Sequence, residues 1–212
     1  MEHITDSIHH LPDVMGGPTL LVDEDEVVVI DTGVPGAEAD ILAALTELGR
    51  EPQEVRHVLI THADGDHVGG LAALVAATGA RVYASEHEAD VIEGRAPARS
   101  GETREWGRVD ERVRPGEKVS VHGGVEVVDT AGHTLGHVAY FLPREGVLVA
   151  GDCVNNREGL AGSPPQLTAD ADQARKAVRT IAVLAPRTLC MGHGPSLVGD
   201  AAEQLAELDR TL

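Results

Sequence analysis

The sequence is poor in aromatic residues, in basic residues and in cysteine. Phe, Trp and Tyr make up only 2% of the 212 residues, and 17 Lys and Arg stand against 35 Asp and Glu, for a formal net charge of −18. Such a charge repels phosphate backbones, so the composition disfavours nucleic acid as a partner. The two cysteines, Cys153 and Cys190, are too few for a disulfide framework, so we expect a reducing, cytoplasmic environment.

Long apolar runs are also missing. No stretch of 18 or more apolar residues occurs, and the segment Met1–His10 is polar and acidic. The sequence therefore predicts neither a transmembrane helix nor a secretory signal, and no membrane partner. Because 42% of the residues are apolar, a chain of this length can bury one good core, and we expect residues 1–212 to form a single domain.

Strand and helix patterns form two blocks along the chain. Alternating or continuous apolar residues predict strands at Thr19–Val22, Glu26–Ile30, His57–Ile60, Arg81–Ala84, Lys118–Val121, Val125–Asp129, Val138–Leu142, Val147–Ala150 and Thr188–Met191. Helical spacing predicts helices at Ala37–Leu48, Val68–Thr78, Glu86–Glu93, Ala169–Leu184 and Asp200–Leu212. Two blocks of strands, each accompanied by helices, indicate an α/β protein with helices packed outside paired sheets.

The most distinctive segment follows the predicted strand His57–Ile60. It holds four potential metal ligands within six residues: His62, Asp64, Asp66 and His67. The i, i+2, i+4 spacing of the first three lets a short loop aim them at one point, and Gly65 permits the sharp turn between them. The fourth would face a second point close by. Imidazole and carboxylate groups are ligands that zinc accepts at roughly 2.0–2.2 Å.

Three more candidate ligands lie downstream, each in a glycine-containing turn after an apolar run: His133, Asp152 and His193. A single histidine after a strand is usually a packed or exposed side chain without a ligand. Seven candidate ligands, each in a matching turn, are much less easily explained without a bound metal. Together they predict a metal site.

The order of these residues resembles the metallo-β-lactamase fold superfamily, whose signature is H-x-H-x-D-H followed by a distant His, Asp and His. The segment Thr130–His137 resembles the family turn P-G-H-T-x-G-H, Ala150–Asp152 resembles its strand-ending G-D, and Gly192–Gly194 resembles its final G-H-G. The resemblance covers nearly the whole chain. It implies a four-layer αββα sandwich, with the remaining histidines structural or exposed.

The resemblance also implies how the ligands divide. The first site would consist of His62, Asp64 and His133, the second of Asp66, His67 and His193, and Asp152 would bridge two metal ions. The aspartate of the D-T-G turn, Asp31, would hydrogen-bond near the ligand loop and orient it.

One position departs from the family pattern, because Asp64 replaces the second histidine of the signature. A carboxylate is a harder ligand than imidazole, so it shifts the preference toward iron or manganese without excluding zinc. We expect two divalent ions, zinc first. The alternative is that Asp64 turns outward and leaves a single metal at the second site.

A metal pair bridged by hydroxide supplies a nucleophile at neutral pH, since coordination lowers the pKa of water to about 7. The predicted function is a metal-dependent hydrolase that cleaves an ester, lactone, thioester or amide bond of a small molecule, with Asp66 also orienting the hydroxide. The chain most resembles the compact glyoxylase-like and lactonase-like hydrolases of the family. The alternative is an iron-dependent oxidoreductase on the same fold, resembling persulfide dioxygenases or flavodiiron proteins.

The segment Gly94–Gly116 has no periodicity, but it contains six of the 17 basic residues and the only tryptophan. One interpretation is a mobile lid that recruits an anionic substrate. The other is a solvated loop whose arginines balance neighbouring acids. The substrate-binding candidates are Trp106, Arg104, Arg108 and Asn155.

Overall fold

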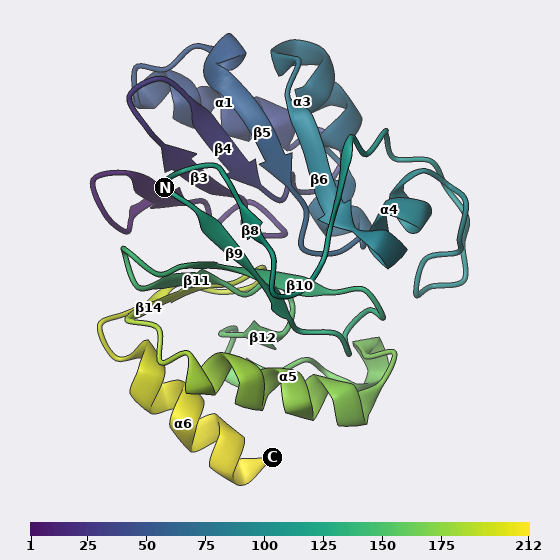
Figure 1. Ribbon diagram of the computed structural model, residues 1–212, viewed down its shortest axis with the longest axis vertical. Coiled ribbons are helices and arrows are strands. Elements are labelled where there is room, and N and C mark those ends of the chain that lie inside the picture. The colour runs from purple at the N-terminus through teal and green to yellow at the C-terminus, as the bar shows by residue number, and fades with distance from the viewer.

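The computed structural model describes residues 1–212. Two β-sheets stack face to face, and helices cover the outer side of each sheet (Figure 1). In Figure 1, α1 and α3 lie against the upper sheet, and α5 and α6 lie below the lower one. This arrangement is the α/β, four-layer αββα sandwich that the sequence predicts.

The first sheet has seven strands in sequence order, β1 to β7. The strands are β1 (Glu2–His3), β2 (Ile8–His10), β3 (Thr19–Val22), β4 (Val27–Ile30), β5 (Val55–Leu59), β6 (Arg81–Ser85) and β7 (Glu111–Val113). Strands β1 to β4 pair antiparallel, and β4 to β7 pair parallel. Parallel neighbours need long crossovers. These contain η1 (Pro52–Glu54), α1 (Glu38–Glu47), α2 (Gly65–Val68), α3 (Leu71–Thr78) and α4 (Glu86–Ile92).

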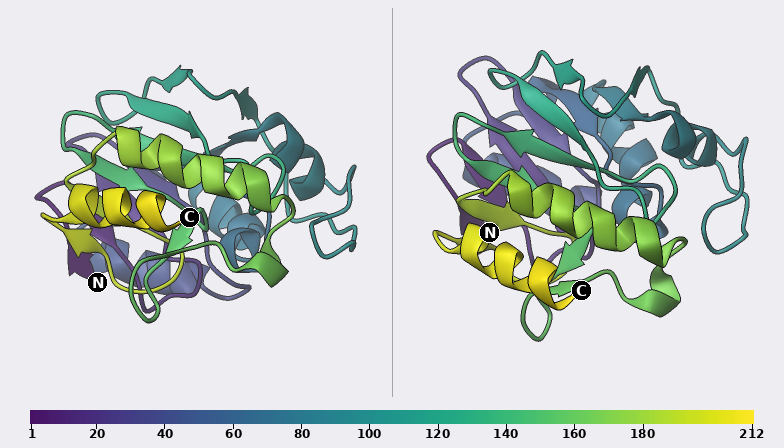
Figure 2. Two further views of the ribbon diagram at one scale, coloured as in Figure 1. Left: turned by 90° about the horizontal axis from the view of Figure 1, so that it is seen from below. Right: turned by 60° about the horizontal axis from the view of Figure 1, so that its bottom comes forward.

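The second sheet has six strands in the order β15-β14-β11-β10-β9-β8. They are β8 (Lys118–Val119), β9 (Val125–Asp129), β10 (Val138–Leu142), β11 (Val147–Val149), β14 (Thr188–Cys190) and β15 (Leu197–Val198). The crossover from β11 to β14 includes the small pair β12 (Val154–Asn155) and β13 (Ala161–Gly162), then η2 (Pro165–Leu167) and α5 (Ala171–Val183). Helix α6 (Ala201–Thr211) ends the chain and packs beside α5 (Figure 2).

Three apolar clusters fill the three interfaces between the four layers. They contain 20, 17 and 13 buried residues, and the middle one lies between the two sheets. Strand β4 shows why: Val27 and Val29 belong to the outer cluster, whereas Val28 and Ile30 belong to the middle one. Successive side chains of a strand point to opposite faces, so a strand that is apolar throughout can serve two cores.

The helix predicted at Val68–Thr78 is wrong as a single element. The chain instead forms α2 and α3, separated by Gly69 and Gly70. A Cβ on Gly69 would lie 2.4 Å from the Pro35 ring, and a Cβ on Gly70 would lie 2.4 Å from the Thr32 carbonyl oxygen. The glycine pair therefore lets the ligand loop pack directly against the turn after β4, at the cost of breaking the helix.

The segment Gly94–Gly116 is less irregular than its sequence suggests, because it includes β7. That strand has only one buried apolar residue, Val113, so it leaves no alternating pattern to detect. The loop before it is closed at its base: Glu93 and Glu105 form an isolated bridge, and the Trp106 N–H donates to the Ile92 carbonyl at 2.8 Å. The short strands β1 and β2 are likewise absent from the predicted set.

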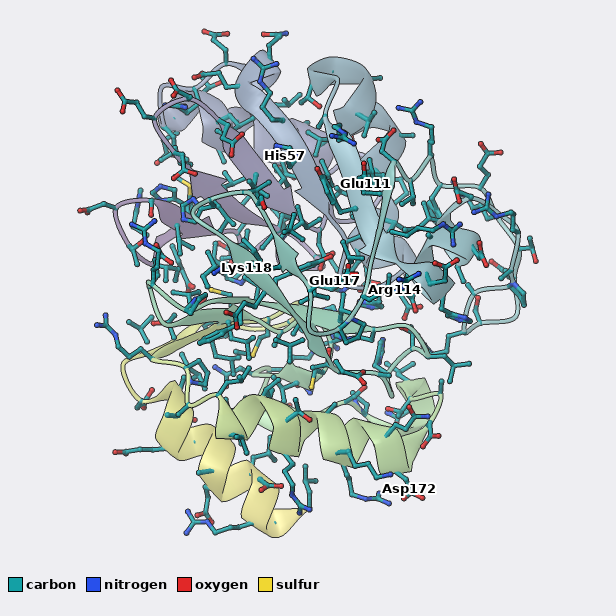
Figure 3. The ribbon with its side chains drawn as sticks, viewed as in Figure 1. His57, Glu111, Arg114, Glu117, Lys118 and Asp172 are labelled. Atoms are coloured by element: carbon teal, nitrogen blue, oxygen red, sulfur yellow. The ribbon has the colours of Figure 1, made fainter.

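Charged side chains project from the outside of the layers (Figure 3). His57 and Glu111 of the first sheet and Lys118 of the second lie on one face and help to line a cavity of about 370 Å³. None of the candidate metal ligands lines it. Among the helices, none combines the length and apolar character needed to cross a lipid bilayer.

Candidate metal centre

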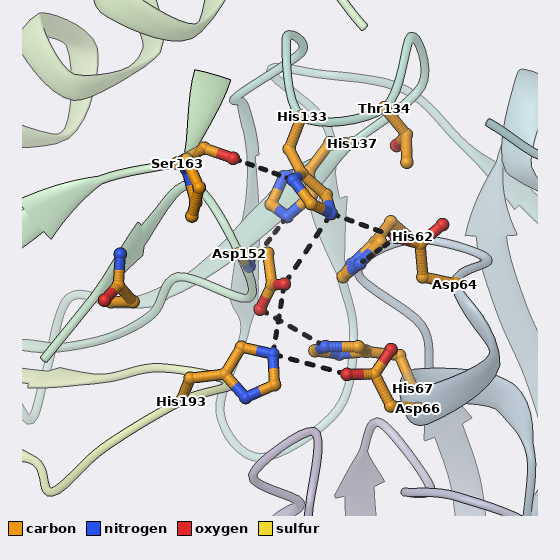
Figure 4. Close-up of polar contacts among 12 residues, drawn as sticks. His62, Asp64, Asp66, His67, His133, Thr134, His137, Asp152, Ser163 and His193 are labelled. Atoms are coloured by element: carbon orange, nitrogen blue, oxygen red, sulfur yellow. Dashed lines mark hydrogen bonds and ion pairs between the residues drawn. The ribbon is translucent and has the colours of Figure 1, made fainter. Parts of the chain in front are cut away.

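The seven candidate ligands follow the carboxyl ends of strands. His62 to His67 come after β5, His133 after β9, Asp152 after β11 and His193 after β14. Strands β9, β11 and β14 run in the same direction, as do β4 and β5 within the other sheet. The loops at these ends meet at one edge of the sandwich, and their side chains converge there (Figure 4).

The first group consists of His62, Asp64 and His133. The Asp64 Oδ2 atom lies 3.1 Å from His133 Nε2 and 3.9 Å from His62 Nε2. Asp64 therefore turns inward, toward the two imidazoles that the sequence prediction grouped with it. The outward orientation that would leave it away from the site does not occur in this structure.

The second group consists of Asp66, His67 and His193. His193 Nε2 lies 3.3 Å from Asp66 Oδ2. Asp152 stands between the two groups: its Oδ1 lies 3.2 Å from His67 Nε2, and its Oδ2 lies 3.3 Å from His193 Nε2 and 3.6 Å from His133 Nε2. The structure thus brings all seven predicted residues to one place. A third group, His62, His67 and Asp152, joins the two sets, so the division into two metal sites stays a prediction.

The donor set fits a divalent cation. Two ligands that each bind a tetrahedral ion at about 2.1 Å stand roughly 3.4 Å apart, close to the separations found here. In addition, the buried His62 Nε2 has no hydrogen-bond partner, and the buried His67 Nε2 and Asp152 Oδ1 have none beyond the 3.2 Å ion-pair contact between them. Buried polar atoms are seldom left unpaired, so these three atoms face a position where a cation would satisfy them.

The far ring nitrogens of three histidines are fixed by hydrogen bonds. His67 Nδ1 donates to Asp31 Oδ2 at 2.8 Å, and His62 Nδ1 contacts Thr61 Oγ1 at 3.0 Å. The Thr61 hydroxyl already donates to Asp31, so it accepts from His62. His133 Nδ1 pairs with Ser163 Oγ at 2.7 Å. Protons on the Nδ1 atoms of His62 and His67 leave their Nε2 lone pairs directed inward, as metal ligands require.

A buried glutamate ties the two ligand loops of the first group together. Glu88, on α4, is 1% exposed. It accepts from the Ala63 N–H at 2.8 Å, and from the Thr134 hydroxyl at 2.8 Å and the Gly136 N–H at 2.9 Å. Ala63 lies between two candidate ligands, and Thr134 follows a third. Glu88 therefore sets the spacing of the first group, although it touches none of its ligand atoms.

His137, which the sequence places among the structural or exposed histidines, is buried directly behind the site. Its Nε2 accepts from the Asp152 backbone N–H at 3.0 Å, and its Nδ1 contacts Thr130 Oγ1 at 2.8 Å. Burial and the neighbouring His133 lower the pKa of His137 to about 3. The neutral ring therefore holds the backbone of Asp152 in place.

The site is a compact set of bases that share protons when no cation is present. Burial disfavours a charged His67, but Asp152 and Asp31 raise its pKa well above the ordinary value. Burial also opposes charge on His193, yet its hydrogen bonds to Asp152 and Asp66 raise its pKa to about 9. A divalent ion must displace these protons, so cation affinity falls as the pH falls.

A cavity of about 450 Å³ opens beside the first group. Asp64, Glu88 and Thr134 line it, together with Arg99 from the loop after α4. Arg99 forms a close ion pair with the Asp64 carboxylate. The volume is in the usual range for a small-molecule site.

The four predicted substrate-binding residues lie in different surroundings. Trp106 is half-buried against the outer apolar cluster and packs on Gly65 of the ligand loop. Arg104 lies over its ring at 4.0 Å. Arg108 is exposed and pairs with Asp110, and Asn155 donates to the Gly162 carbonyl at 3.1 Å. None of the four lines the cavity beside Asp64, so their contact with substrate stays a prediction.

Sequence reasoning missed Glu88, Arg99 and Ser163. A signal existed for Glu88: it lies three and four residues before Val91 and Ile92, which places a carboxylate on the apolar face of its helix. No local pattern identifies Ser163 or distinguishes Arg99 from the other arginines of its segment, because their contacts join residues 30 and 35 positions apart.

The comparisons with known proteins agree with this geometry. Residues 13–193 match the family model of the metallo-beta-lactamase superfamily. The uncharacterized protein YobT of Bacillus subtilis is 32% identical over 195 residues, covering 84% of this chain and 82% of that protein. A hydroxyacylglutathione hydrolase of Rhodobacter capsulatus is 35% identical over 176 residues, covering 80% of this chain but 57% of the hydrolase.

Solved structures share the fold. A motif mutant of a metallo-beta-lactamase from Cronobacter sakazakii superposes with a TM-score of 0.80 and 19% sequence identity. The match covers 99% of this chain and 94% of that one.

Proposed function

The chain belongs to the metallo-beta-lactamase superfamily, and from this premise we propose that it is a metal-dependent hydrolase of small molecules. The bond cleaved is an ester, lactone, thioester or amide. Support for this bond class comes from the relative named as a hydroxyacylglutathione hydrolase. The chain spans only 57% of that relative, so the proposal does not extend to glutathione compounds.

The observation that carries the proposal is the convergence of four imidazoles and three carboxylates with unpartnered buried atoms. We assign one divalent ion to His62, Asp64 and His133, a second to Asp66, His67 and His193, and Asp152 to both. Zinc is the first choice, because imidazole nitrogen and carboxylate oxygen both suit it. Iron and manganese are the alternatives, since Asp64 adds a hard oxygen ligand.

When bound, such ions polarise a carbonyl group and lower the pKa of water so that it can attack at neutral pH. Side chains of this protein orient the metal ligands and the attacking water. Asp31 and Thr61 keep the imidazoles of His67 and His62 turned inward. The Asp66 side chain is 27% exposed, against 12% for Asp152, so its carboxylate can reach the attacking water, orient it and accept its proton.

The sequence also left open an iron-dependent oxidoreductase. Of the specific observations, only the carboxylate of Asp64 favours iron, and neither of the two relatives compared above is named as an oxidoreductase. Hydrolysis therefore stands as the proposed activity. The proposed partner is a small-molecule substrate rather than nucleic acid, because the net charge of −18 repels phosphate backbones.

Metal content and turnover test the proposal together. The protein is purified without added metal, its zinc, iron and manganese are measured by mass spectrometry, and esters, lactones, thioesters and amides are then screened as substrates. We expect two zinc ions per chain and hydrolysis that chelation abolishes and zinc restores. Iron with oxygen consumption and no hydrolysis would favour the oxidoreductase instead.

A further inference from the structure

The cavity beside Asp64 has a single permanent cation in its lining, Arg99. Permanent cations are scarce in this chain, and three of the six arginines of the same segment, including Arg108 with Asp110, pair with acids outside the cavity. Arg95 pairs with Asp90 and Glu93, and Arg112 pairs with the same two acids. Arg99 alone among the six arginines of residues 94–116 turns into the cavity.

The loop that carries Arg99 is held by backbone hydrogen bonds and by apolar packing. The Gly101 N–H donates to the Ala98 carbonyl at 2.8 Å, and the Ala98 N–H donates to the Glu102 carbonyl at 2.7 Å. Ala96 and Ala98 also pack against the outer apolar cluster. This turn fixes the backbone on both sides of Arg99, and the ion pair with Asp64 holds its side chain at the cavity.

The guanidinium of Arg99 has hydrogen-bonding capacity left over. Its Nε atom is buried and has no partner, and its only carboxylate is that of Asp64. The same Asp64 Oδ2 atom faces His62 and His133, so a divalent ion in the first group would draw on it. Arg99 would then hold free donors beside aspartates whose charge the ions neutralise. This combination attracts a second anion.

We propose that Arg99 is the residue that recognises a carboxylate on the substrate, so that the natural substrates of the proposed hydrolase are small acyl compounds bearing an acid group a short distance from the bond cleaved. The inference rests on the proposed function. Arg99 is the arginine of this segment to which we assign anion binding, and contact of Arg104 and Arg108 with substrate stays a prediction.

The rest of the cavity fits the part of the substrate that links its carboxylate to the carbonyl group of the bond cleaved. Val91, Pro97, Ala98 and Leu135 supply apolar surface, and Leu135 is 55% exposed at the rim. A short methylene chain fits this surface, with its carboxylate on Arg99 and its carbonyl at the metal ligands. The planar guanidinium offers paired donors that match a carboxylate in a bidentate arrangement.

Two esters that differ only in charge test the inference. One is the mono-4-nitrophenyl ester of glutaric acid, and the other is 4-nitrophenyl 5-methylhexanoate, in which an isopropyl group replaces the carboxylate. For the zinc-loaded protein we expect Arg99→Gln to lower kcat/KM for the glutarate ester by about tenfold or more, mainly through KM. The neutral ester should change less than about twofold, and Arg99→Lys should keep part of the preference.

Arg95→Gln is the matched control, because it removes an arginine from the same segment that pairs on the surface. It should leave the ratio of the two esters unchanged. Equal losses on both esters, or a loss of zinc in Arg99→Gln, would show that Arg99 merely holds Asp64 and would overturn the inference.

Binding of free glutarate, measured by calorimetry on the zinc-loaded protein, separates the two proposals. If no ester, lactone, thioester or amide is hydrolysed, the proposed function fails, yet a dissociation constant about tenfold weaker in Arg99→Gln would still support the anion site. If glutarate binds the variant and the wild type equally, the inference fails whatever the hydrolysis shows.

Discussion

The two ligand groups of the centre differ in how the chain holds them. In the second group, His67 is fully buried and its Nδ1 donates to the buried carboxylate of Asp31. In the first group, His133 lies on a loop and pairs with a neutral hydroxyl, that of Ser163. The first group also contains Asp64, which is shared with Arg99.

From this difference we expect that two bound ions would be held unequally. A hydrogen bond to a carboxylate is stronger than one to a neutral hydroxyl and makes the imidazole a better ligand. The arginine next to Asp64 also competes electrostatically with a cation in the first group. We therefore expect the second group to keep its ion at metal concentrations that empty the first.

The largest effect should come from the residue that the two groups share. Asp152 contacts histidines of both, so Asp152→Ala should lose both ions together and reduce hydrolysis at least about 100-fold. Zinc per chain and kcat/KM measure this. The exposed Asp172, on α5, provides the control Asp172→Ala, which should keep both ions. One ion retained in Asp152→Ala would mean that the groups are independent.

The unequal support can be tested directly by removing each outer partner. Asp31→Asn should weaken zinc binding in the second group by roughly 10- to 100-fold, because it replaces the charged acceptor of His67. The effect on the first group should be smaller, because Asp31 reaches His62 only through Thr61. Ser163→Ala removes only a neutral partner of His133, so the first group should lose several-fold less. Competition with a chelator of known affinity gives both constants. A larger loss in Ser163→Ala would reverse the comparison.

The sequence predicts the ligands far better than it predicts their support. The ligand turns contain glycine and follow strands, so His62, His67, His133 and His193 leave local patterns that can be matched one by one. Two blocks of apolar strands with helices beside them predict helices outside paired sheets, and the family resemblance supplies the four-layer αββα arrangement. Both features are local in the chain, which is why they could be predicted.

The supporting contacts depend on tertiary packing. Glu88 meets Thr134 across 46 residues, and Arg99 meets Asp64 across 35 residues. Nothing in either short segment specifies such a partner. The break between α2 and α3 has the same origin, because it follows from the close approach of Gly69 to Pro35, a contact that helix propensity does not contain.

A smaller effect is expected from the buried carboxylate that serves the first group alone. Glu88→Gln places an amide NH₂ among groups that donate to Glu88, so at least one buried donor loses its acceptor, at a cost of roughly 2–3 kcal/mol of unfolding free energy. Zinc should fall toward one ion per chain, because the second group has no contact with Glu88. The exposed Glu86 on the same helix gives the control Glu86→Gln, which should keep both ions. Equal loss of both would show that the groups fold as one unit.

The smallest effect concerns the pH dependence of protein stability, through a buried histidine that packs near the second group. His10 is fully buried on β2, and Gly17 packs between its ring and the Met191 carbonyl, two residues before His193. Burial lowers the pKa of His10 to about 4. The unfolded chain, with an ordinary pKa near 6.5, takes up this proton first, so stability is lost as the pH falls from about 6.5 toward 4.

His10→Asn removes this titration. Between pH 7.5 and pH 5, the wild type should lose about 2 kcal/mol more unfolding free energy than the variant, measured by urea denaturation of the metal-free protein at each pH. The exposed His87 supplies the control, because His87→Asn should keep the pH dependence of the wild type. A wild type and a His10→Asn variant with the same pH dependence would mean that the fold does not lower the pKa of His10.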